Sequence, residues 1–429
     1  MAMTVLVGFA ESLAAIESAW ILRDAGYRVV AFTRDGRSPA LATVRDVRVV
    51  AVPSPEKDLA ATLAALRELV AAEQPVAVLP FDDAALLVTD RLAAELPGLV
   101  VAGPTGPAAG LALDKSEQLD LAAKAGFAVP DTVVLTPGAP PPAGFAAPDT
   151  VVPAPGTPAP AGFAAPDTVV PAPGTPAPAG LPGSGPWMVK CAAAEVVRDG
   201  RLDRPAGGIA RDAAEAHEIA ASFGAPALVQ RLVDGVGEGI FGYAAGGRVY
   251  ALSGHRRVRM MNPRGSGSSA CRSIDVDPDL AAAVARFCEL AGWHGIFMIE
   301  LLRDDAGRAW FMELNGRTWG SMALARARGI PYPQWAVTGA LDPDFRPPAV
   351  PAAPHVLSRH LGREIVHLLA VLRGARGADA GRWPSRGATI AAMLRPAGGT
   401  RWYNTRRGEM NVLARDTWQT VAGQLRRRA

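Results

Sequence analysis

The sequence predicts an α/β protein whose first domain is a doubly wound parallel sheet. Short apolar runs at 4–8, 27–33, 47–52 and 76–81 are typical of buried strands, and helical patterns separate them, as at 58–72. Strands that alternate with helices pair in parallel within one sheet. Because 429 residues exceed one ordinary hydrophobic core, we expect two or three domains.

Composition indicates a globular protein and narrows the choice of partners. Hydrophobic residues make up 49% of the chain and charged residues 20%, while a net charge of +3 is too small to favour nucleic acid. The basic clusters Arg395–Arg407 and Arg426–Arg428 are more typical of a solvated tail than of a polyanion site. Cys191, Cys271 and Cys288 form no disulfide or zinc pattern. With no signal peptide and no apolar run of ~20 residues, a soluble cytoplasmic protein without a membrane span is expected.

The turn after the first strand argues against a dinucleotide-binding domain. Gly8-Phe-Ala-Glu-Ser12 holds one glycine and lacks the Gly-x-Gly-x-x-Gly pattern that lets the backbone approach a pyrophosphate. A dehydrogenase built on the first domain is therefore only a minor alternative, which a nicotinamide titration would test.

A second pattern, at residues 296–317, predicts a β-hairpin. Two apolar runs flank Asp304-Asp-Ala-Gly307, a strong hairpin signal. If Asp304 pairs with Gly307, the side chains of one face are all apolar: Phe297, Ile299, Leu301, Trp310, Met312 and Leu314. The opposite face then carries the remaining set: Glu300, Glu313 and Asn315, with Met298 and Phe311.

The polar face of this hairpin predicts a cation site. In the expected register Glu300 lies opposite Phe311, and Glu313 is its diagonal neighbour at roughly 7–8 Å. Carboxylates so placed repel each other unless a cation lies between them, and oxygen ligands of this kind suit Mg²⁺ bound together with substrate phosphates. Two alternatives stay open. The polar face could simply meet water, or a one-residue slip could put the two glutamates on opposite faces.

The end of the hairpin resembles a known family. Glu313-Leu-Asn-Gly-Arg317 is similar to the Glu-x-Asn-Pro-Arg signature of the ATP-grasp superfamily, with glycine where proline is usual. The resemblance implies that Glu300, Glu313 and Asn315 hold Mg²⁺, with Mn²⁺ as an alternative, on the phosphates of ATP. It implies that Arg317 steadies the reacting phosphoryl or carboxyl group. The fold it implies is a parallel-sheet domain followed by a two-subdomain α+β module.

Earlier segments are similar to the nucleotide-binding parts of the same superfamily. Asp114-Lys115 opens a helical pattern that Gly126 closes, and Lys190 ends the strand-like run 186–190. By the resemblance both lysines contact ATP phosphates. The run 227–235 looks like the adenine hinge, with backbone groups of Arg231 and Val233 on the base. The resemblance adds two flanking residues, Gln230 beside the hinge and Glu238 at the ribose hydroxyls.

The family's glycine-rich phosphate lid has no clear counterpart in the sequence. The stretch Cys191–Arg204 contains only Gly200, so either Pro205–Gly208 supplies the lid or the lid is reduced. A reduced lid is the best argument for a regulatory ATP-binding protein without turnover. The intact set of metal ligands argues against that alternative.

Arginines beside a glycine- and serine-rich loop predict an anion site. His255-Arg-Arg257 precedes the loop Gly265–Ser269, and Arg272 follows it. Guanidinium groups bind carboxylate and phosphate bidentately, and backbone N–H groups of such a loop assist them. The alternative is a mobile polar loop between two strands. Arg257 is therefore a candidate for steadying the carboxylate substrate, whereas His255 is expected to be structural.

An internal repeat interrupts the predicted module. Ala125–Val134 returns as Ala143–Val152 and again as Ala161–Val170, separated by units of nearly pure proline, alanine, glycine and threonine. Such units are too short and too rich in proline to bury a core, so an extended linker is expected. The first copy continues the helix before it, as family members do, and the later copies look like duplications.

The chain is thus expected to have four parts. They are a Rossmann-like pre-ATP-grasp domain at 1–105, an ATP-grasp module at 106–135 and 186–340, the linker at 136–185, and a C-terminal extension at 341–429. The extension contains an amphipathic helical pattern at 355–372 and otherwise matches nothing.

The resemblance implies an ATP-dependent carboxylate–amine ligase. ATP would phosphorylate a carboxylate to an acyl phosphate, and an amine or similar nucleophile would then displace phosphate. The expected partners are a small carboxylate and a small amine, and a homodimer is left open. The sequence names neither substrate.

Overall fold

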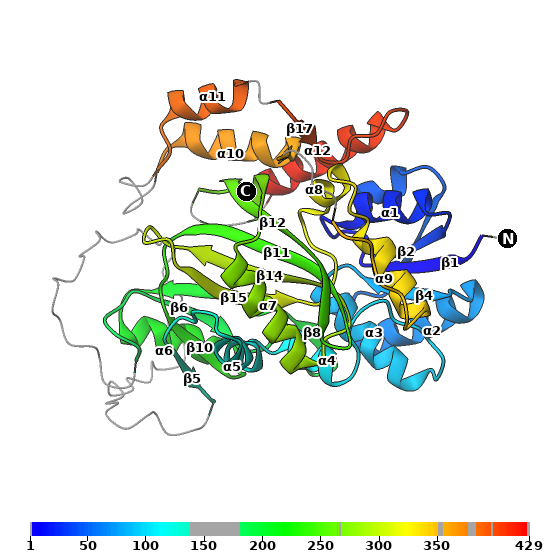
Figure 1. Ribbon diagram of the computed structural model, residues 1–429, viewed down its shortest axis with the longest axis horizontal. Helices are drawn as coiled ribbons and strands as arrows, with labels where there is room; N and C mark the ends of the chain where they lie inside the picture. Colours follow the sequence, from blue (N-terminus) through cyan, green and yellow to red (C-terminus); the bar gives the residue numbers. More distant parts are fainter. Residues whose placement is uncertain are drawn as a thin grey trace, which may run out of the picture.

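The computed structural model describes residues 2–137, 181–263, 265, 267–350, 355–375, 383–395 and 398–426. The second and third repeat copies, and with them residues 138–180 of the predicted linker, lie outside these residues. In Figure 1 the N-terminal unit lies on the right, a large sheet occupies the centre, and the helices of the C-terminal extension lie above it. No helix of the described ranges is long and apolar enough to cross a membrane.

The N-terminal unit is the doubly wound parallel sheet that the sequence predicted. Its strands have the order β3-β2-β1-β4 and pair in parallel. Val5 and Val7 of the central strand belong to one apolar cluster and Leu6 to another, because alternate side chains of a strand point to opposite faces. The elements of this unit are β1 (Thr4–Gly8), α1 (Ala15–Asp24), β2 (Arg28–Arg34), a 3₁₀ turn (Ala40–Thr43), β3 (Val47–Val52), α2 (Leu59–Glu73), β4 (Ala77–Pro80) and α3 (Asp83–Glu95).

A smaller antiparallel sheet follows, with the strand order β5-β10-β6-β9. Helix α6 packs against it, and Trp187, Val189 and Phe223 fill the space between them. The predicted strand 227–235 is shorter than expected, because β10 ends at Arg231. The elements are α4 (Pro107–Leu113), α5 (Lys115–Ala125), β5 (Thr132–Leu135), β6 (Trp187–Cys191), β9 (Gly208–Ala210), α6 (Ala213–Ser222) and β10 (Ala227–Arg231).

The central sheet has seven strands in the order β15-β14-β11-β12-β13-β16-β17. Helices α5 and α7 cover one of its faces, where Phe297, Ile299 and Phe311 join an apolar cluster. The β14–β15 hairpin was predicted from the sequence, whereas β11, β13 and α7 were not. The elements are β11 (Val236–Ala245), β12 (Arg248–Met260), β13 (Ser268–Ile274), α7 (Pro278–Ala291), β14 (Gly295–Arg303) and β15 (Ala309–Asn315).

The C-terminal extension adds two strands to the central sheet and covers its other face. The helix predicted at 355–372 was wrong at its start, because β16 pairs with β13 over Leu357–Arg359. The helix begins at Leu361, where the side chain of His360 accepts the amide of Arg363. Helices α8 (Met322–Ala327) and α9 (Tyr332–Leu341) follow the hairpin and precede the extension, whose elements are β16 (Leu357–Arg359), α10 (Leu361–Arg373), α11 (Arg386–Leu394), β17 (Thr400–Trp402) and α12 (Met410–Arg426).

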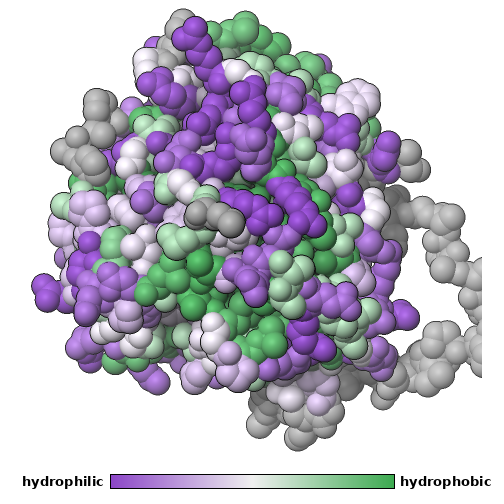
Figure 2. Space-filling model, turned by 90° about the vertical axis from the view of Figure 1, so that its right-hand side faces the viewer, coloured by the Kyte–Doolittle hydropathy of each residue, from purple (hydrophilic) through white to green (hydrophobic). Residues whose placement is uncertain are grey.

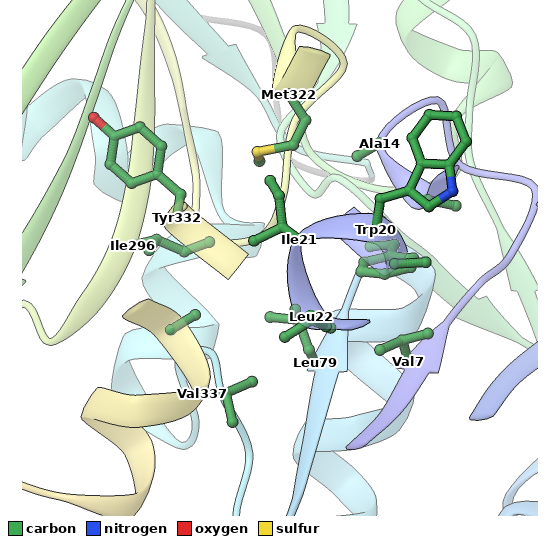
Figure 3. Close-up of a cluster of buried hydrophobic side chains, with 14 of the residues drawn as sticks. Val7, Ala14, Trp20, Ile21, Leu22, Leu79, Ile296, Met322, Tyr332 and Val337 are labelled. Carbon is green, nitrogen blue, oxygen red and sulfur yellow. The ribbon is translucent and has the colours of Figure 1, made fainter. Parts of the chain in front are cut away.

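One apolar cluster joins the N-terminal unit to the central sheet. Figure 3 shows Ile21 of α1 on the side of Met322, Ile296 of β14 and Tyr332 of α9, while Trp20 points away from them, and all five are buried. On the surface of the N-terminal side, apolar areas lie between hydrophilic ones (Figure 2). Because the buried contacts between the two sheets are extensive, the strand ends of the N-terminal unit are held at a fixed position beside the central sheet.

Candidate active site

The turn of the β14–β15 hairpin differs from the prediction by one residue. Asp304 donates its amide to the carbonyl of Arg308 at 3.0 Å, so Asp304 pairs with Arg308 and not with Gly307. The three residues between them form the loop, and Gly307 has φ +83°, which a residue with a Cβ rarely adopts. A three-residue loop that ends in a left-handed glycine is a common hairpin connection.

A bulge then moves the register by a second residue. Leu301 pairs with Phe311, whereas Glu300 pairs with Glu313, so Met312 is the extra residue. The predicted pairing of Glu300 with Phe311 was therefore wrong. In the observed register Glu300 and Glu313 lie closer together than predicted, because directly opposite residues lie nearer to each other than diagonal ones.

The bulge also corrects the predicted faces. Phe311 lies on the apolar face, where its ring contacts Phe127 and Phe287, and not beside Glu300. Trp310 and Met312, which were expected in that apolar face, are only partly buried. An inserted residue reverses the alternation of side chains on one side of it, and no local signal in the sequence marks its position.

Glu300, Glu313 and Asn315 form an oxygen-rich group with incomplete charge compensation. The amide of Asn315 donates to Glu313 at 3.2 Å. Burial raises the pKa of Glu300, the nearby Glu313 raises it further, and Arg257 opposes both effects. A hard divalent cation fits this donor set, because it would offset the repulsion between two carboxylates and accept an amide oxygen. No cluster of three or more His, Cys, Asp or Glu ligands exists in the described part of the chain. Mg²⁺ is usually held by one or two carboxylates, with water and substrate phosphates in the rest of its shell.

Lys190 lies close enough to this group for its charge to interact with both glutamates, and Lys115 lies close enough to act on Lys190. Lys190 lies on β6 with Nζ 3.5 Å from the carbonyl of Met312, on the hairpin. Burial lowers the pKa of Lys190 to about 8; Lys115 lowers it further, while Glu313 and Glu300 oppose the shift. Asp114 caps helix α5 and so fixes Lys115 at its first turn. An anion between the two ammonium groups would stabilise the charged form of both.

The predicted hinge lies at the end of β10. Gln230 is buried and donates to the hydroxyl of Thr132 at 2.9 Å, so its side chain serves the sheet. The amide of Arg231 is already bonded to the carbonyl of Asp131, and its guanidinium lies over the ring of Trp310 on the hairpin. The chain leaves the sheet after Arg231, so the backbone around Val233 is not part of a strand.

Glu238 has a different environment from the one expected at a ribose. Its side chain is 2% exposed, and its two oxygens accept from Arg256 and Arg303 at 2.7 and 2.9 Å. Both oxygens are therefore occupied by structural ion pairs. These ion pairs join β11 to its two neighbouring strands, and the ribose contact stays a prediction.

The two arginines predicted to share an anion site are separated. Arg257 donates to Glu300 at 2.5 Å, whereas Arg272 is exposed and lies opposite Arg256 on β12. Strand β13 begins at Ser268, so half of the predicted loop is sheet, and alternation turns Arg272 away from the hairpin carboxylates. The prediction that Arg272 belongs to this site was wrong.

His255 is structural, as expected. Both of its ring nitrogens are buried without a hydrogen-bond partner, and its ring contacts Phe241. Burial lowers the pKa of His255 to about 3, with a further contribution from Arg257, so the imidazole is neutral. A base this weak is poorly suited to accept a proton at neutral pH.

Arg317 is held by a carboxylate of the N-terminal unit. Its Nε and one terminal nitrogen lie 2.9 and 3.3 Å from the two oxygens of Asp83. Asp83 was not among the site residues predicted from the sequence, although it directly follows the strand-like run 76–81. The available signal is the rule that functional side chains gather beyond the carboxyl ends of parallel strands, here β4.

A β-hairpin occupies the position where the lid was sought. Strands β7 (Val196–Arg198) and β8 (Arg201–Asp203) pair only with each other, and Asp199 and Gly200 form the turn with φ +49° and +73°. Two successive residues with positive φ give the tight turn that Asp-Gly favours. The lid candidate is thus the β7–β8 hairpin, which lies in the glycine-poor stretch Cys191–Arg204. Pro205 to Gly207 form only an irregular connection to β9.

Comparisons with known proteins identify the fold. No protein-family model and no curated protein matches the sequence. Among solved structures, the L-amino acid ligase from Bacillus licheniformis matches at a TM-score of 0.54 with 14% identity, covering 81% of this chain and 78% of that one. Biotin carboxylase from Campylobacter jejuni matches at 0.58 with 12% identity, covering 83% and 75%. An N5-carboxyaminoimidazole ribonucleotide synthetase in its ADP complex matches at 0.53 with 13% identity, covering 87% and 84%.

Proposed function

Since the chain has the ATP-grasp fold, we propose that it is an ATP-dependent ligase that activates a carboxylate as an acyl phosphate and joins it to an amine or similar nucleophile. The observation that carries the proposal is the pairing of Glu300 with Glu313 beside Asn315, within electrostatic range of two lysines. Three acceptor side chains with one nearby arginine leave room for a cation. The two lysines, both partly buried, supply the complementary site for phosphates.

The chain's own residues would bind and orient the nucleotide. The carbonyl of Arg231 and the amide of Val233 would receive the adenine edge, since the amide of Arg231 is already used in the sheet. Lys115 and Lys190 would hold phosphate oxygens. Mg²⁺ held by Glu300, Glu313 and Asn315 would offset charge on the phosphates when bound. In this proposal residues 106–135 and 186–340 form the nucleotide-binding module, and residues 1–105 carry Asp83.

The chemistry proceeds by two displacements. An oxygen of the substrate carboxylate attacks the γ-phosphorus, and the bond to the bridging oxygen of ADP breaks. The amine then attacks the acyl carbon, the carbon–oxygen bond to phosphate breaks, and the amine loses a proton. Arg317 and Arg257 would steady the carboxylate and the charge that develops around it, because guanidinium matches both groups bidentately.

Two alternative functions, a regulatory ATP-binding protein and a dehydrogenase, have weaker structural support. The argument for an ATP-binding protein without turnover was a reduced lid, but a hairpin with a well-formed turn occupies that place. A dehydrogenase needs a helix directly after the first strand, whereas β1 ends at Gly8 and α1 begins at Ala15. Phe9 fills that turn as a fully buried side chain.

The proposal is tested by isotope transfer. Release of ADP is first measured over a panel of carboxylates and amines. With an ¹⁸O-labelled carboxylate, the released phosphate must contain one labelled oxygen, because that oxygen attacked the γ-phosphorus. Unlabelled phosphate from a productive turnover contradicts the ligase mechanism. ATP binding without turnover on any pair supports the regulatory alternative.

A further inference from the structure

The β7–β8 hairpin is placed by the N-terminal unit and not by its own sheet. Figure 1 shows β8 beside that unit, away from β6 and α6, which flank the hairpin in sequence. The carbonyl of Gly200 accepts the amide of Leu59 at 2.9 Å, and the amide of Leu202 donates to the carbonyl of Pro55 at 2.8 Å. The amide of Leu59 is in the first turn of α2, where helix N–H groups lack partners within the helix.

A buried side chain and an ion pair complete this contact. Leu202 is 2% exposed and belongs to the apolar cluster that contains Leu59 and Leu63 of α2. An isolated two-stranded hairpin is marginally stable in water, so these contacts determine where it lies. At its end, Arg204 lies 3.1 Å from an oxygen of Asp83.

Asp83 therefore receives one arginine from the hairpin and one from the end of β15. Arg204 approaches Oδ2, and Arg317 binds Oδ1 and Oδ2 together. Burial by itself would raise the pKa of Asp83, but the charge and hydrogen bonds of Arg317, with the charge of Arg204, lower it below its ordinary value. The carboxylate is not needed to cap α3, because Asp82 does so by accepting the amide of Ala85 at 2.7 Å.

We propose that Asp83 is a positioning residue that couples docking of the β7–β8 hairpin to the orientation of Arg317. The role of Arg317 in this inference rests on the proposed ligase function. With the hairpin docked, Arg204 and Arg317 fix the carboxylate between them, and the plane of the Arg317 guanidinium is set. When the hairpin moves away, Arg204 leaves, Leu202 meets water and the amide of Leu59 loses its partner. Arg317 is thus oriented for acyl transfer only while the hairpin is docked, and in that state the hairpin also excludes water from the phosphates.

The first experiment measures docking without turnover. Trypsin cleaves after Arg198 and Arg201, whereas Pro205 blocks cleavage after Arg204, so the rate of cleavage in the hairpin reports how often it leaves the N-terminal unit. Asp83→Asn and Leu202→Ala are expected to raise this rate severalfold. Glu68→Gln, an exposed change on α2, is the matched control and should behave as the wild type.

The second experiment measures kinetics. Asp83→Asn is expected to lower kcat roughly ten- to a hundredfold while the Kd of ATP stays near that of the wild type, because adenine and phosphates are held elsewhere. Arg204→Gln should give a smaller loss in kcat, and Asp83→Glu should restore part of it. The double variant Asp83→Asn with Arg204→Gln should have the same kcat as Asp83→Asn alone, since both substitutions remove the ion pair between Asp83 and Arg204. Arg201→Ala on the same hairpin should leave kcat unchanged.

The third experiment uses the reciprocity of coupling between sites. Among the described residues, Arg317 makes hydrogen bonds to Asp83 and to the carbonyl of Thr318 but none to the hairpin, so Arg317→Gln alters the cleavage rate only if Asp83 connects them. A change of twofold or more in either direction supports the coupling, and an unchanged rate overturns it. The cleavage rate can be measured even if no ligase activity is found. Failure of this proposal can therefore be told apart from failure of the proposed function. The side chain of Arg204 is 61% exposed, so Arg204→Gln should keep the fold. If this variant has the kcat and the cleavage rate of the wild type, the proposal is also overturned.

Discussion

Strand β12 contributes one arginine to each of two partly or fully buried carboxylate sites, and their charges are balanced in opposite ways. At the first site, Arg257 meets Glu300, which also faces Glu313 across the hairpin. One arginine in contact thus serves two neighbouring acids, and burial together with the second acid raises the pKa of Glu300.

At the second site, Glu364 of α10 is surrounded by donors. Arg259 of β12 binds both of its oxygens, Arg359 binds one of them twice, and the hydroxyl of Ser269 donates at 2.7 Å. Burial would raise the pKa of Glu364, but these hydrogen bonds and charges lower it. A carboxylate whose charge is fully compensated by arginines, here called the complete site, stabilises the fold. A carboxylate pair with one arginine in contact, here called the incomplete site, is available to a cation. The predictions below test this contrast.

The largest effect is expected at the complete site. Glu364→Gln leaves two buried arginines without an anion and should lower the free energy of unfolding by roughly 3–5 kcal/mol. Urea denaturation measures this, with Glu289→Gln on the exposed face of α7 as the control. In the wild type the contribution is present above the ordinary pKa of 4.5 and disappears as the pH falls through the lowered native value, so the variant should show a flatter acid limb.

Turnover should be most sensitive at the incomplete site. Glu313→Gln should lower kcat and kcat/KM together by about 10²–10³-fold, as loss of one electrostatic contact to a transition state does. Stability should be unchanged or higher, because the repulsion with Glu300 disappears. Glu300→Gln should act alike and not add to it, since both residues serve one cation. A lower melting temperature together with wild-type kcat would show that the pair is structural.

Arg257 should distinguish the substrate from ATP. Arg257→Ala removes a charge-assisted contact and should weaken binding of the carboxylate by about 1.5–3 kcal/mol, more than it weakens ATP. Arg272→Ala is the matched control, because this arginine is exposed and points away from the site. Calorimetric titration with each ligand provides the comparison. If ATP affinity alone fell, Arg257 would belong to the phosphates.

Lys190 should give the ATP site a pH dependence. The protonated form binds phosphate, and the pKa of Lys190 in the free protein is about 8. Affinity for a non-hydrolysable ATP analogue should therefore fall about tenfold between about pH 7 and 9, as the ammonium fraction falls. Lys190→Gln should bind weakly at every pH and lose this slope. An unchanged slope in the variant would assign the titration to another group.

The smallest effect is expected from the repeats. Residues 143–178 lie outside the described ranges and comprise two whole repeat units, so their removal rejoins equivalent residues. The melting temperature and the affinity for ATP should stay as in the wild type, because linkers of this composition bury no core. A melting temperature lower by several degrees would show that these units pack against the protein.

The sequence alone determined the parts that depend on local periodicity. The parallel sheet of the N-terminal unit follows from apolar runs that alternate with helical ones, and helix capping by Asp58 and Asp114 follows from residue type and spacing. The motif Glu313-Leu-Asn-Gly-Arg317 carried the resemblance to the ATP-grasp fold, and the two apolar runs around Asp304–Gly307 placed Glu300 and Glu313 on one face of a hairpin. Each of these features follows from residue type and spacing along a continuous stretch of chain.

Only the tertiary structure decided what depends on distant contacts. The bulge at Met312, which sets Glu300 directly against Glu313, follows from how both strands pack on α5 and α7. Arg272 faces away because a register defined by β12 and β16 places it there. Arg317 meets Asp83 across 234 residues of chain, and Glu364 comes to β12 from the C-terminal extension. Side-chain spacing repeats over two to four residues, whereas these pairs form only when whole elements are brought together, so no local pattern contains them.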